Sequence, residues 1–253
     1  MKKVLAIILA LAMIFSFAAC GQKEEAKPQP EAKEVLTMAT EGTFPPYEFY
    51  DGDKLVGIDV EVGALIAEKL GMDFEATDIA FDSIIPGVQA GKYDMGMAGM
   101  TVYEERLKQV NFTTSYATGV QVVIVPEEAS LVASLDDLAN VTIGVQESTT
   151  GHIYCEDEFG AENVVAFSTG VLAVQALLNG DVDCVVIDNE PAKAFVAANE
   201  GLTILDTEYA VEEYAAAISK DNEALLAAFN EVLDAKIADG TVAAIVAKYI
   251  NAE

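Results

Sequence analysis

Basic residues are scarce in this chain, and arginine is nearly absent. The 253 residues include 14 lysines and arginines against 42 aspartates and glutamates, and Arg106 is the only arginine. This imbalance argues against binding to nucleic acid or to anionic lipid, because clusters of lysine and arginine hold such partners. Beyond that exclusion, the acidic surplus indicates a solvated exterior that resists aggregation.

Histidine and cysteine are also too few for several kinds of site. His152 is the only histidine, and no residues have metal-ligand spacing, so a histidine-rich metal site is excluded. We expect neither a metal nor a cofactor. Cys155 and Cys184 permit a disulfide in an exported protein without requiring one. Cys184 stands in the apolar run CVVI and is interpreted as a small core residue.

A long apolar run occurs only near the start of the chain. The stretch MKKVLAIILALAMIFSFAAC has two lysines, an apolar run from Val4 to Phe17 and small residues before Cys20. Because the run is short for a membrane-spanning helix, it is typical of a secretory signal, placed at 1–19. The ending Phe-Ala-Ala-Cys resembles a bacterial lipobox, although leucine is more usual than Phe17. The resemblance implies that Cys20 is lipidated; a permanent signal anchor is the alternative.

The next residues, 20–34, contain the charged, proline-containing stretch GQKEEAKPQPEAKE. This composition predicts a flexible tether that holds a domain off a membrane surface. Loss of Lys2 and Lys3 with the signal leaves 12 basic residues against 42 acidic ones, a net charge of −30. We therefore expect an extracytoplasmic domain, anchored to the outer face of the cell membrane through the lipid on Cys20.

From residue 35 onward, strand-like and helix-like segments alternate, which predicts an α/β fold with largely parallel sheets. The expected strands are 35–40, 73–79, 93–100, 120–126, 141–145, 163–167 and 183–187. The expected helices are 58–71, 81–92, one from Thr101, one after Thr149, 170–180, 221–235 and 240–250. In the helix 58–71, Asp59 is the expected N-cap and Gly71 the expected end.

Two segments of the chain echo each other. VQAGKYDMGMAGM (88–100) and LLNGDVDCVVIDN (177–189) match at an offset of 89, with Gly91 on Gly180. The pattern is common, but it favours two similar lobes, each with an open α/β sheet. Ligands of such sheets lie beyond the carboxyl ends of the strands, so two facing lobes would share one cleft.

One expected strand end combines a helix start with the single arginine. Thr101 and Glu104 have the Thr-x-x-Glu spacing of a capping box, which predicts a helix beginning at Thr101 with Arg106 in its early turns. A helix N-terminus and a guanidinium together form a receptor for a carboxylate. The alternative is a surface arginine balanced by Glu104 and Glu105. Because lysine serves equally well on a surface, the lone arginine favours the receptor.

Other strand ends supply partners for the rest of a ligand. Thr149 and Thr150, in ESTTGH, favour a second helix start that holds the other edge of the carboxylate; an ordinary N-cap is the alternative. Asp188 ends a buried strand and either pairs with an ammonium or serves as a turn residue. Aromatic residues at Phe44, Tyr47 and Phe81 either wall an apolar slot or belong to the core. A carboxylate receptor with a counter-charge for an ammonium describes a site for a free α-amino acid.

The sequence resembles the solute-binding proteins of polar amino acid ABC importers, the extracellular solute-binding family 3. The resemblance covers roughly 35–250 and includes ATEGTFPPYEF, GIDVEVGALIAEKLG, AGMTVYEERLKQVNF and VVIDNEP. It implies a type II periplasmic-binding-protein-like fold, with two α/β lobes, a ligand cleft between them and a two-strand hinge. Lobe 1 is expected at 35–118 plus 215–253, and lobe 2 at 119–214.

The resemblance also implies roles for individual residues. The ligand carboxylate would be held by Arg106 with Gly99, Thr101, Thr149 and Thr150. The ammonium would be held by Asp188 and Gly99. The side-chain pocket would be formed by Glu41, Phe44, Tyr47 and Phe81, with Glu41 at the far end. Two positions depart from the family pattern: Ser148 replaces a frequent glycine, and Ala98 replaces a serine that is frequent in receptors for basic amino acids.

These expectations describe a monomeric receptor that passes a polar L-amino acid to an ABC permease. Glu41, Tyr47 and the acidic surface favour arginine, lysine or histidine as the ligand; glutamine or another neutral polar amino acid is the alternative. A cleft enzyme of dehydratase type, using Glu41, Glu147 and Asp188 as acid and base, is a rival from another class. An amino acid sensor without transport is a further alternative.

Overall fold

A computed structural model describes residues 34–250, which belong to one compact unit. The expected signal 1–19, the expected lipidation site at Cys20 and all of the expected tether except Glu34 lie outside the described residues. Within 34–250, no helix is long and apolar enough to span a bilayer.

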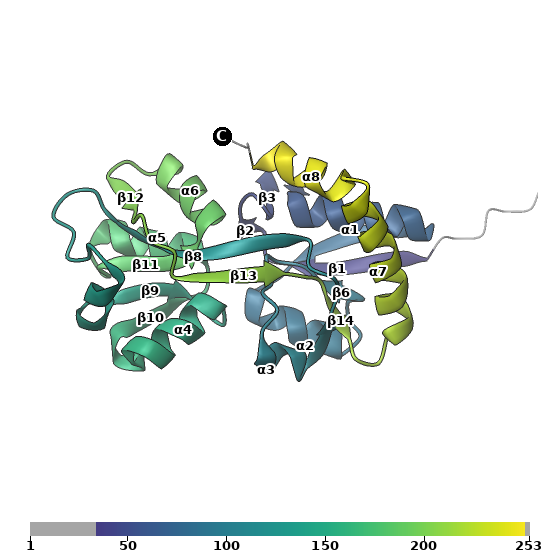
Figure 1. Cartoon of the computed structure of the whole chain (residues 1–253), viewed down its shortest axis with the longest axis horizontal. Coiled ribbons are helices and arrows are strands. Elements are labelled where there is room, and N and C mark those ends of the chain that lie inside the picture. The colour runs from purple at the N-terminus through teal and green to yellow at the C-terminus, as the bar shows by residue number, and fades with distance from the viewer. Residues whose placement is uncertain (1–33, 251–253) are drawn as a thin grey trace, which may run out of the picture. The chain divides into compact units, whose positions relative to one another are not determined.

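The first lobe is built on a five-stranded sheet in the order β5-β1-β6-β14-β7. β1 pairs in parallel with β5 and β6, whereas β14 is antiparallel to β6 and β7. The strands are β1 (Val35–Thr40), β5 (Asp73–Asp78), β6 (Met95–Gly96), β7 (Val110–Phe112) and β14 (Ala217–Ser219). Its helices are α1 (Ile58–Leu70), α2 (Ile84–Gln89), α3 (Glu104–Leu107), α7 (Glu223–Ala238) and α8 (Thr241–Tyr249) (Figure 1). A small antiparallel sheet adds β2 (Thr43–Phe44), β3 (Glu48–Asp51) and β4 (Lys54–Val56).

The second lobe is built on a six-stranded sheet in the order β10-β9-β11-β8-β12, with β13 also paired to β8. The strands are β8 (Ala117–Pro126), β9 (Ile143–Gln146), β10 (Val164–Phe167), β11 (Cys184–Asp188), β12 (Leu202–Ile204) and β13 (Ala210–Tyr214). The covering helices are α4 (Thr150–Phe159), α5 (Gly170–Asn179) and α6 (Asn189–Ala198). Its core includes Cys155 and Cys184, which are buried free thiols, so the interpretation of Cys184 as a core residue is confirmed.

Two long strands connect the lobes. β8 and β13 pair in antiparallel register, from Ala117 opposite Tyr214 to Gln121 opposite Ala210. In Figure 1 they run side by side between the two sheets, and the chain therefore crosses from lobe to lobe twice. The expected fold class, two α/β lobes joined by a pair of strands, is confirmed.

Several local signals place helix ends correctly. Gly71 and Gly180 end α1 and α5 in the left-handed conformation that glycine adopts without steric cost. Thr149 caps α4, because its Oγ1 accepts a hydrogen bond from the N–H of His152.

The expected N-cap of α1 is wrong. Gly57, with φ of 132°, is the N-cap, and Asp59 lies in the first turn with its side chain fully buried. A Cβ at position 57 would lie 2.1 Å from the carbonyl oxygen of Tyr47, so the close approach of two chain segments requires glycine there. This packing sets the helix start and turns Asp59 inward.

The helix expected from Thr101 is also wrong. α3 begins three residues later, at Glu104, without a side-chain cap. Thr101 instead forms an isolated antiparallel bridge with Tyr214, and its hydroxyl donates to Glu212 Oε2 at 3.0 Å. Because both partners come from β13, a contact with the hinge overrides the local capping pattern.

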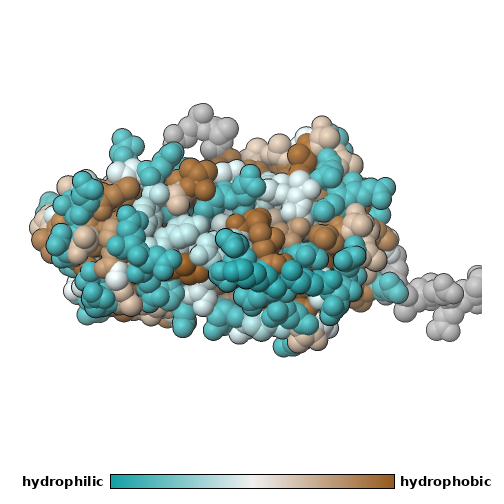
Figure 2. Space-filling model, turned by 60° about the horizontal axis from the view of Figure 1, so that its bottom comes forward, coloured by the Kyte–Doolittle hydropathy of each residue, from teal (hydrophilic) through white to brown (hydrophobic). Residues whose placement is uncertain are grey.

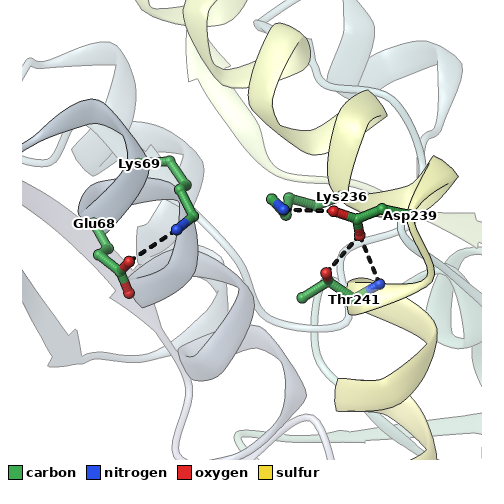
Figure 3. Close-up of polar contacts among 5 residues, drawn as sticks. All are labelled: Glu68, Lys69, Lys236, Asp239 and Thr241. Atoms are coloured by element: carbon green, nitrogen blue, oxygen red, sulfur yellow. Dashed lines mark hydrogen bonds and ion pairs between the residues drawn. The ribbon is translucent and has the colours of Figure 1, made fainter.

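The face of the molecule drawn in Figure 2 mixes hydrophilic residues with several separate hydrophobic patches. At the turn between α7 and α8, Asp239 pairs with Lys236 and accepts the N–H of Thr241 at 2.9 Å (Figure 3). Glu68 and Lys69 form another pair at 2.9 Å. Such exposed ion pairs contribute little to stability, because water screens them.

Candidate functional site

A cavity lies between the lobes, where strands of both sheets end. Its empty volume is about 300 Å³. The lining residues from the first lobe are Glu41, Phe44, Glu48, Phe81, Ala98, Gly99, Thr101 and Arg106. Those from the second lobe are Gln146, Thr149, Thr150 and Asp188. The fold therefore brings together every predicted ligand-site residue except Tyr47.

Arg106 lies buried between the two lobes. Its Nη1 donates to the carbonyl oxygen of Thr101, and its Nη2 donates to that of Ser148, both at 3.0 Å. The guanidinium carbon lies 5.3 Å from the centre of the Phe81 ring. A guanidinium has five N–H donors, so three remain for a ligand.

The surface-arginine alternative does not describe Arg106. Its side chain is 6% exposed and forms no ion pair with any residue in 34–250. Glu104 and Glu105 pair with Lys108 instead. Burial lowers the pKa of the guanidinium, and the nearby Glu212 opposes that shift. A buried cation without a direct counter-ion is suited to receiving an anion.

The backbone of Thr101 faces the same way as the guanidinium. Val102 donates its N–H to Glu213, and Met100 accepts from the N–H of Ala215, so the hydrogen bonds to β13 flank Thr101. In an antiparallel pair, the residue between two such bonds directs its own N–H and C=O away from the partner strand. Its carbonyl accepts from Arg106, and its N–H is therefore presented on the Arg106 side.

Gly99 can serve only part of its predicted role. Its N–H donates to Asp59 Oδ2 at 2.9 Å, so that N–H is not free for a ligand carboxylate. The carbonyl oxygen remains available to an ammonium. Gly99 has φ of 50°, and an added Cβ would lie 2.7 Å from the Phe44 ring, so the position requires glycine.

The start of α4 forms the facing wall of the cavity. The hydroxyl of Thr149 donates to the carbonyl of Gln146 at 2.8 Å and also caps the helix, so the ordinary N-cap alternative holds for this side chain. Thr150 has its hydroxyl 3.5 Å from that of Thr101, across the cleft. Ser148 has φ of 64°, a backbone conformation that glycine adopts without steric cost.

Asp188 closes another side of the cavity at the end of β11. Its side chain is buried and does not cap α6; Oδ1 accepts the hydroxyl of Tyr214. Burial raises the pKa of this carboxyl to about 7, with a further contribution from Glu212. A cation beside Asp188 would favour its ionised form.

Glu41 makes a contact across the cleft. Its Oε1 accepts the hydroxyl of Thr43 at 2.6 Å, and its Oε2 accepts Nε2 of Gln146 at 3.4 Å. Burial raises the pKa of Glu41, and these two hydrogen bonds partly oppose the shift. Gln146 ends β9 but follows the expected strand 141–145, and it was missed in the sequence because it belongs to no motif.

Tyr47 does not line the cavity, so its predicted place in the side-chain pocket is wrong. Its side chain is 1% exposed and packs edge to face against Tyr214, with ring centres 5.0 Å apart. Phe44 and Phe81 do line the cavity. The neighbouring Glu48, in PPYEF, also lines the cavity and is buried, but it was missed in the sequence.

A buried guanidinium and several carboxyls, set between two α/β lobes joined by paired strands, define a solute-binding protein of the periplasmic type. The bacterial extracellular solute-binding proteins, family 3, match residues 36–252, and the chain belongs to that family. Because this is a family of binding proteins, the expectation that the chain is not an enzyme is confirmed.

Individual relatives bind amino acids. The arginine-binding extracellular protein ArtP of Bacillus subtilis is 30% identical over 261 residues, which cover 100% of both chains. An ancestral arginine-binding protein solved with glutamine is 37% identical, with a TM-score of 0.82 over 87% of this chain and 99% of that one. The arginine-, lysine-, histidine-binding protein ArtJ of Geobacillus stearothermophilus is 33% identical, with a TM-score of 0.81 over 87% of this chain and 96% of that one.

Proposed function

We propose that this chain captures a free basic L-amino acid, namely arginine, lysine or histidine, outside the cytoplasm and delivers it to an ABC importer. The names of ArtP and ArtJ support this ligand class. The cavity supports a free amino acid as the ligand, because its residues suit both the carboxylate and the ammonium of a zwitterion.

Three groups would hold the ligand carboxylate. The free N–H donors of Arg106 and the N–H of Thr101 lie on one side, and the hydroxyl of Thr150 lies on the other. The first N–H groups of α4 lack acceptors within the helix and add positive potential there. Asp188 would hold the ammonium, together with the carbonyl oxygen of Gly99.

The observation that carries the ligand class is the surplus of carboxyl groups in the cavity. One ligand carboxylate and one ammonium would satisfy Arg106 and Asp188. Glu41 and Glu48 then remain in the lining without a cation. A cationic side chain between Phe44 and Phe81 would supply the missing charge, because burying an unpaired carboxylate is costly.

Glutamine is the second candidate ligand. Glu41 already bonds to Gln146, and burial raises its pKa, so a protonated Glu41 would suit a neutral amide. The relative that was solved with glutamine supports this alternative.

The proposed mechanism is lobe closure. We assign lobe 1 to 35–118 plus 215–253 and lobe 2 to 119–214, because β8 and β13 are the strands that cross between the sheets. Bending within these strands would close the lobes over the ligand and present the closed form to the permease. We also propose that the protein is a monomer anchored to the membrane through a lipid on Cys20.

Calorimetric titration tests the ligand class. The full-length chain in detergent is unfolded and refolded to remove retained ligand and then titrated with each of the common amino acids. Tight binding confined to arginine, lysine or histidine is expected. Tight binding of glutamine alone would overturn the basic class but keep the receptor, and an absence of binding by any amino acid would overturn the proposal.

A further inference from the structure

Glu48 is the one carboxyl in the cavity lining that no predicted role uses. It begins β3, its side chain is 0% exposed, and it lines the same cavity as Arg106 and Asp188. No N–H or hydroxyl among the described residues donates to either of its carboxyl oxygens. A buried carboxyl in such a position needs a proton, a cation or another partner.

The partner of Glu48 is a second buried carboxyl. Glu48 is in hydrogen-bonding contact with Asp59, on the first turn of α1. Because an ionised carboxylate only accepts hydrogen bonds, two carboxyls can bond to each other only through a shared proton. Asp59 Oδ2 already accepts the N–H of Gly99 at 2.9 Å and the hydroxyl of Tyr116 at 2.7 Å. These two donors stabilise the anion on Asp59, so the shared proton belongs mainly to Glu48.

The other groups around Glu48 also favour its protonated form. Burial raises the pKa of Glu48 well above its usual range and that of Asp59 to about 6. The titratable groups that face this pair from the neighbouring elements are Glu41 after β1, Asp188 at the end of β11, and the hydroxyls of Tyr47 and Tyr116. All of these groups are acids, and each ionised carboxylate among them opposes the ionisation of Glu48.

We propose that Glu48 is a second residue that reads the cationic side chain of the ligand, and that it does so by giving up the proton it shares with Asp59. This inference rests on the proposed function. When the cation enters, the O–H bond of Glu48 breaks and the proton passes to solvent. The carboxylate that remains faces the ligand cation, which offsets its repulsion with Asp59. Capture of a basic amino acid is therefore coupled to the release of a proton.

A neutral side chain would not release this proton. Citrulline has nearly the shape of arginine but no positive charge on its side chain, so it is the matched ligand. Both ligands carry an ammonium, and any proton that leaves Asp188 is released in both cases. The difference between the two ligands therefore isolates the carboxyls that respond to the side chain.

Glu48→Gln is the matched variant. Glutamine keeps the shape of Glu48, and its amide can still donate a hydrogen bond to Asp59, but it has no proton to lose. Glu147→Gln is the control, because Glu147 is an exposed carboxyl that does not line the cavity.

The experiment is calorimetry of the full-length chain in detergent at about pH 6, within the range where the buried carboxyls titrate. Arginine and citrulline are titrated in buffers with different heats of ionisation, which gives the number of protons released. We expect arginine to release up to about one proton more than citrulline, and its affinity to rise by up to about tenfold more per pH unit. In Glu48→Gln the extra proton is lost and arginine binds about tenfold or more weakly, whereas Glu147→Gln keeps the extra release and the affinity of the wild-type chain.

Each outcome separates this inference from the proposed function. Equal proton release by arginine and citrulline in the wild-type chain overturns the role of Glu48, as does an unchanged proton count for arginine in Glu48→Gln. If citrulline binds too weakly to measure, the proton count for arginine must still fall in Glu48→Gln. If Glu48→Gln does not fold, the comparison of the two ligands on the wild-type chain decides. Failure of arginine, lysine and histidine to bind overturns the proposed function itself.

Discussion

Arg106 Nη2 donates a 3.0 Å hydrogen bond to the carbonyl oxygen of Ser148, which places a first-lobe guanidinium against the second lobe. The same guanidinium donates to Thr101 in its own lobe. One side chain therefore contacts both walls of the cleft, and a carboxylate bound to it would also touch both. This geometry gives a physical reason for retaining a single arginine in a chain that otherwise uses lysine.

Arg106→Ala should abolish measurable binding of amino acids. Loss of the guanidinium leaves the ligand carboxylate buried without a cation, at a cost of about 3–5 kcal/mol. The thermal midpoint should change much less than the affinity, because Arg106 forms no ion pair within 34–250. Calorimetry and thermal unfolding would measure the two effects. Arg106→Lys keeps the positive charge but not the planar guanidinium, so its affinity should lie between those of wild type and Arg106→Ala. If Arg106→Ala binds ligand within tenfold of the wild-type affinity, Arg106 does not hold the carboxylate.

Asp188→Asn should alter how stability depends on pH in the unliganded protein. The pKa of Asp188 is raised from 3.8 to about 7, so the folded state holds a proton that the unfolded state releases. This contribution to stability is fully present below about pH 4 and is lost as the pH rises toward 7. Asn mimics the neutral form of Asp188, so at pH 8 the free energy of unfolding of the variant should exceed that of wild type by about 2–4 kcal/mol. Urea unfolding at both ends of this range would measure the gain, and a constant difference between the two proteins would contradict it.

Glu41→Gln should weaken arginine binding by about 2 kcal/mol, since a charge-assisted hydrogen bond becomes a neutral one. Affinity for glutamine should hold or improve. Glu147→Gln is the control, because Glu147 follows β9 near the cleft but is exposed and does not line the cavity. Titration of both variants with arginine and glutamine would test the role, and equal affinities in the two variants would remove Glu41 from the side-chain pocket.

Gly99→Ala should destabilise the protein by about 1–3 kcal/mol and lower its affinity for ligand. The cost has two parts: the positive φ and the approach of the new Cβ to the Phe44 ring. Gly52→Ala isolates the first part, because Gly52 also has a positive φ but an added Cβ there would meet no atom within 4 Å. Chemical unfolding would measure the stability of both variants. Equal losses of stability would show that the Phe44 ring moves away from the new Cβ at no energetic cost.

Local signals in the sequence predict much of the fold. The glycines at 71 and 180 end their helices where expected, and Thr149 caps α4, because these features depend on a few neighbouring residues. The alternation of strands and helices likewise predicts two α/β sheets. The convergence of Arg106, Thr150 and Asp188 on one cavity follows from the rule that ligands lie beyond strand ends.

The predictions that are wrong concern residues whose contacts lie in distant parts of the chain. Thr101 has a capping pattern, yet Glu212 takes its hydroxyl from a strand more than a hundred residues away. Asp59 appears suited to cap a helix, yet it turns inward to bond to Gly99 and Tyr116. Tertiary hydrogen bonds of this kind have no local pattern, so the pairing of Asp59 with Glu48 was not predictable from either residue alone.

The two buried thiols of the second lobe make it a natural chemical reporter. Cys155 and Cys184 are both 0% exposed, and burial raises the pKa of each thiol, that of Cys155 to about 12. Because the thiolate is the species that reacts, an alkylating reagent should leave both residues unmodified while this lobe stays folded. Their alkylation rate, followed by mass spectrometry, would therefore time the transient unfolding of one lobe without an introduced label. An added amino acid should slow the alkylation of these cysteines only if the ligand binds to the second lobe as well as to the first.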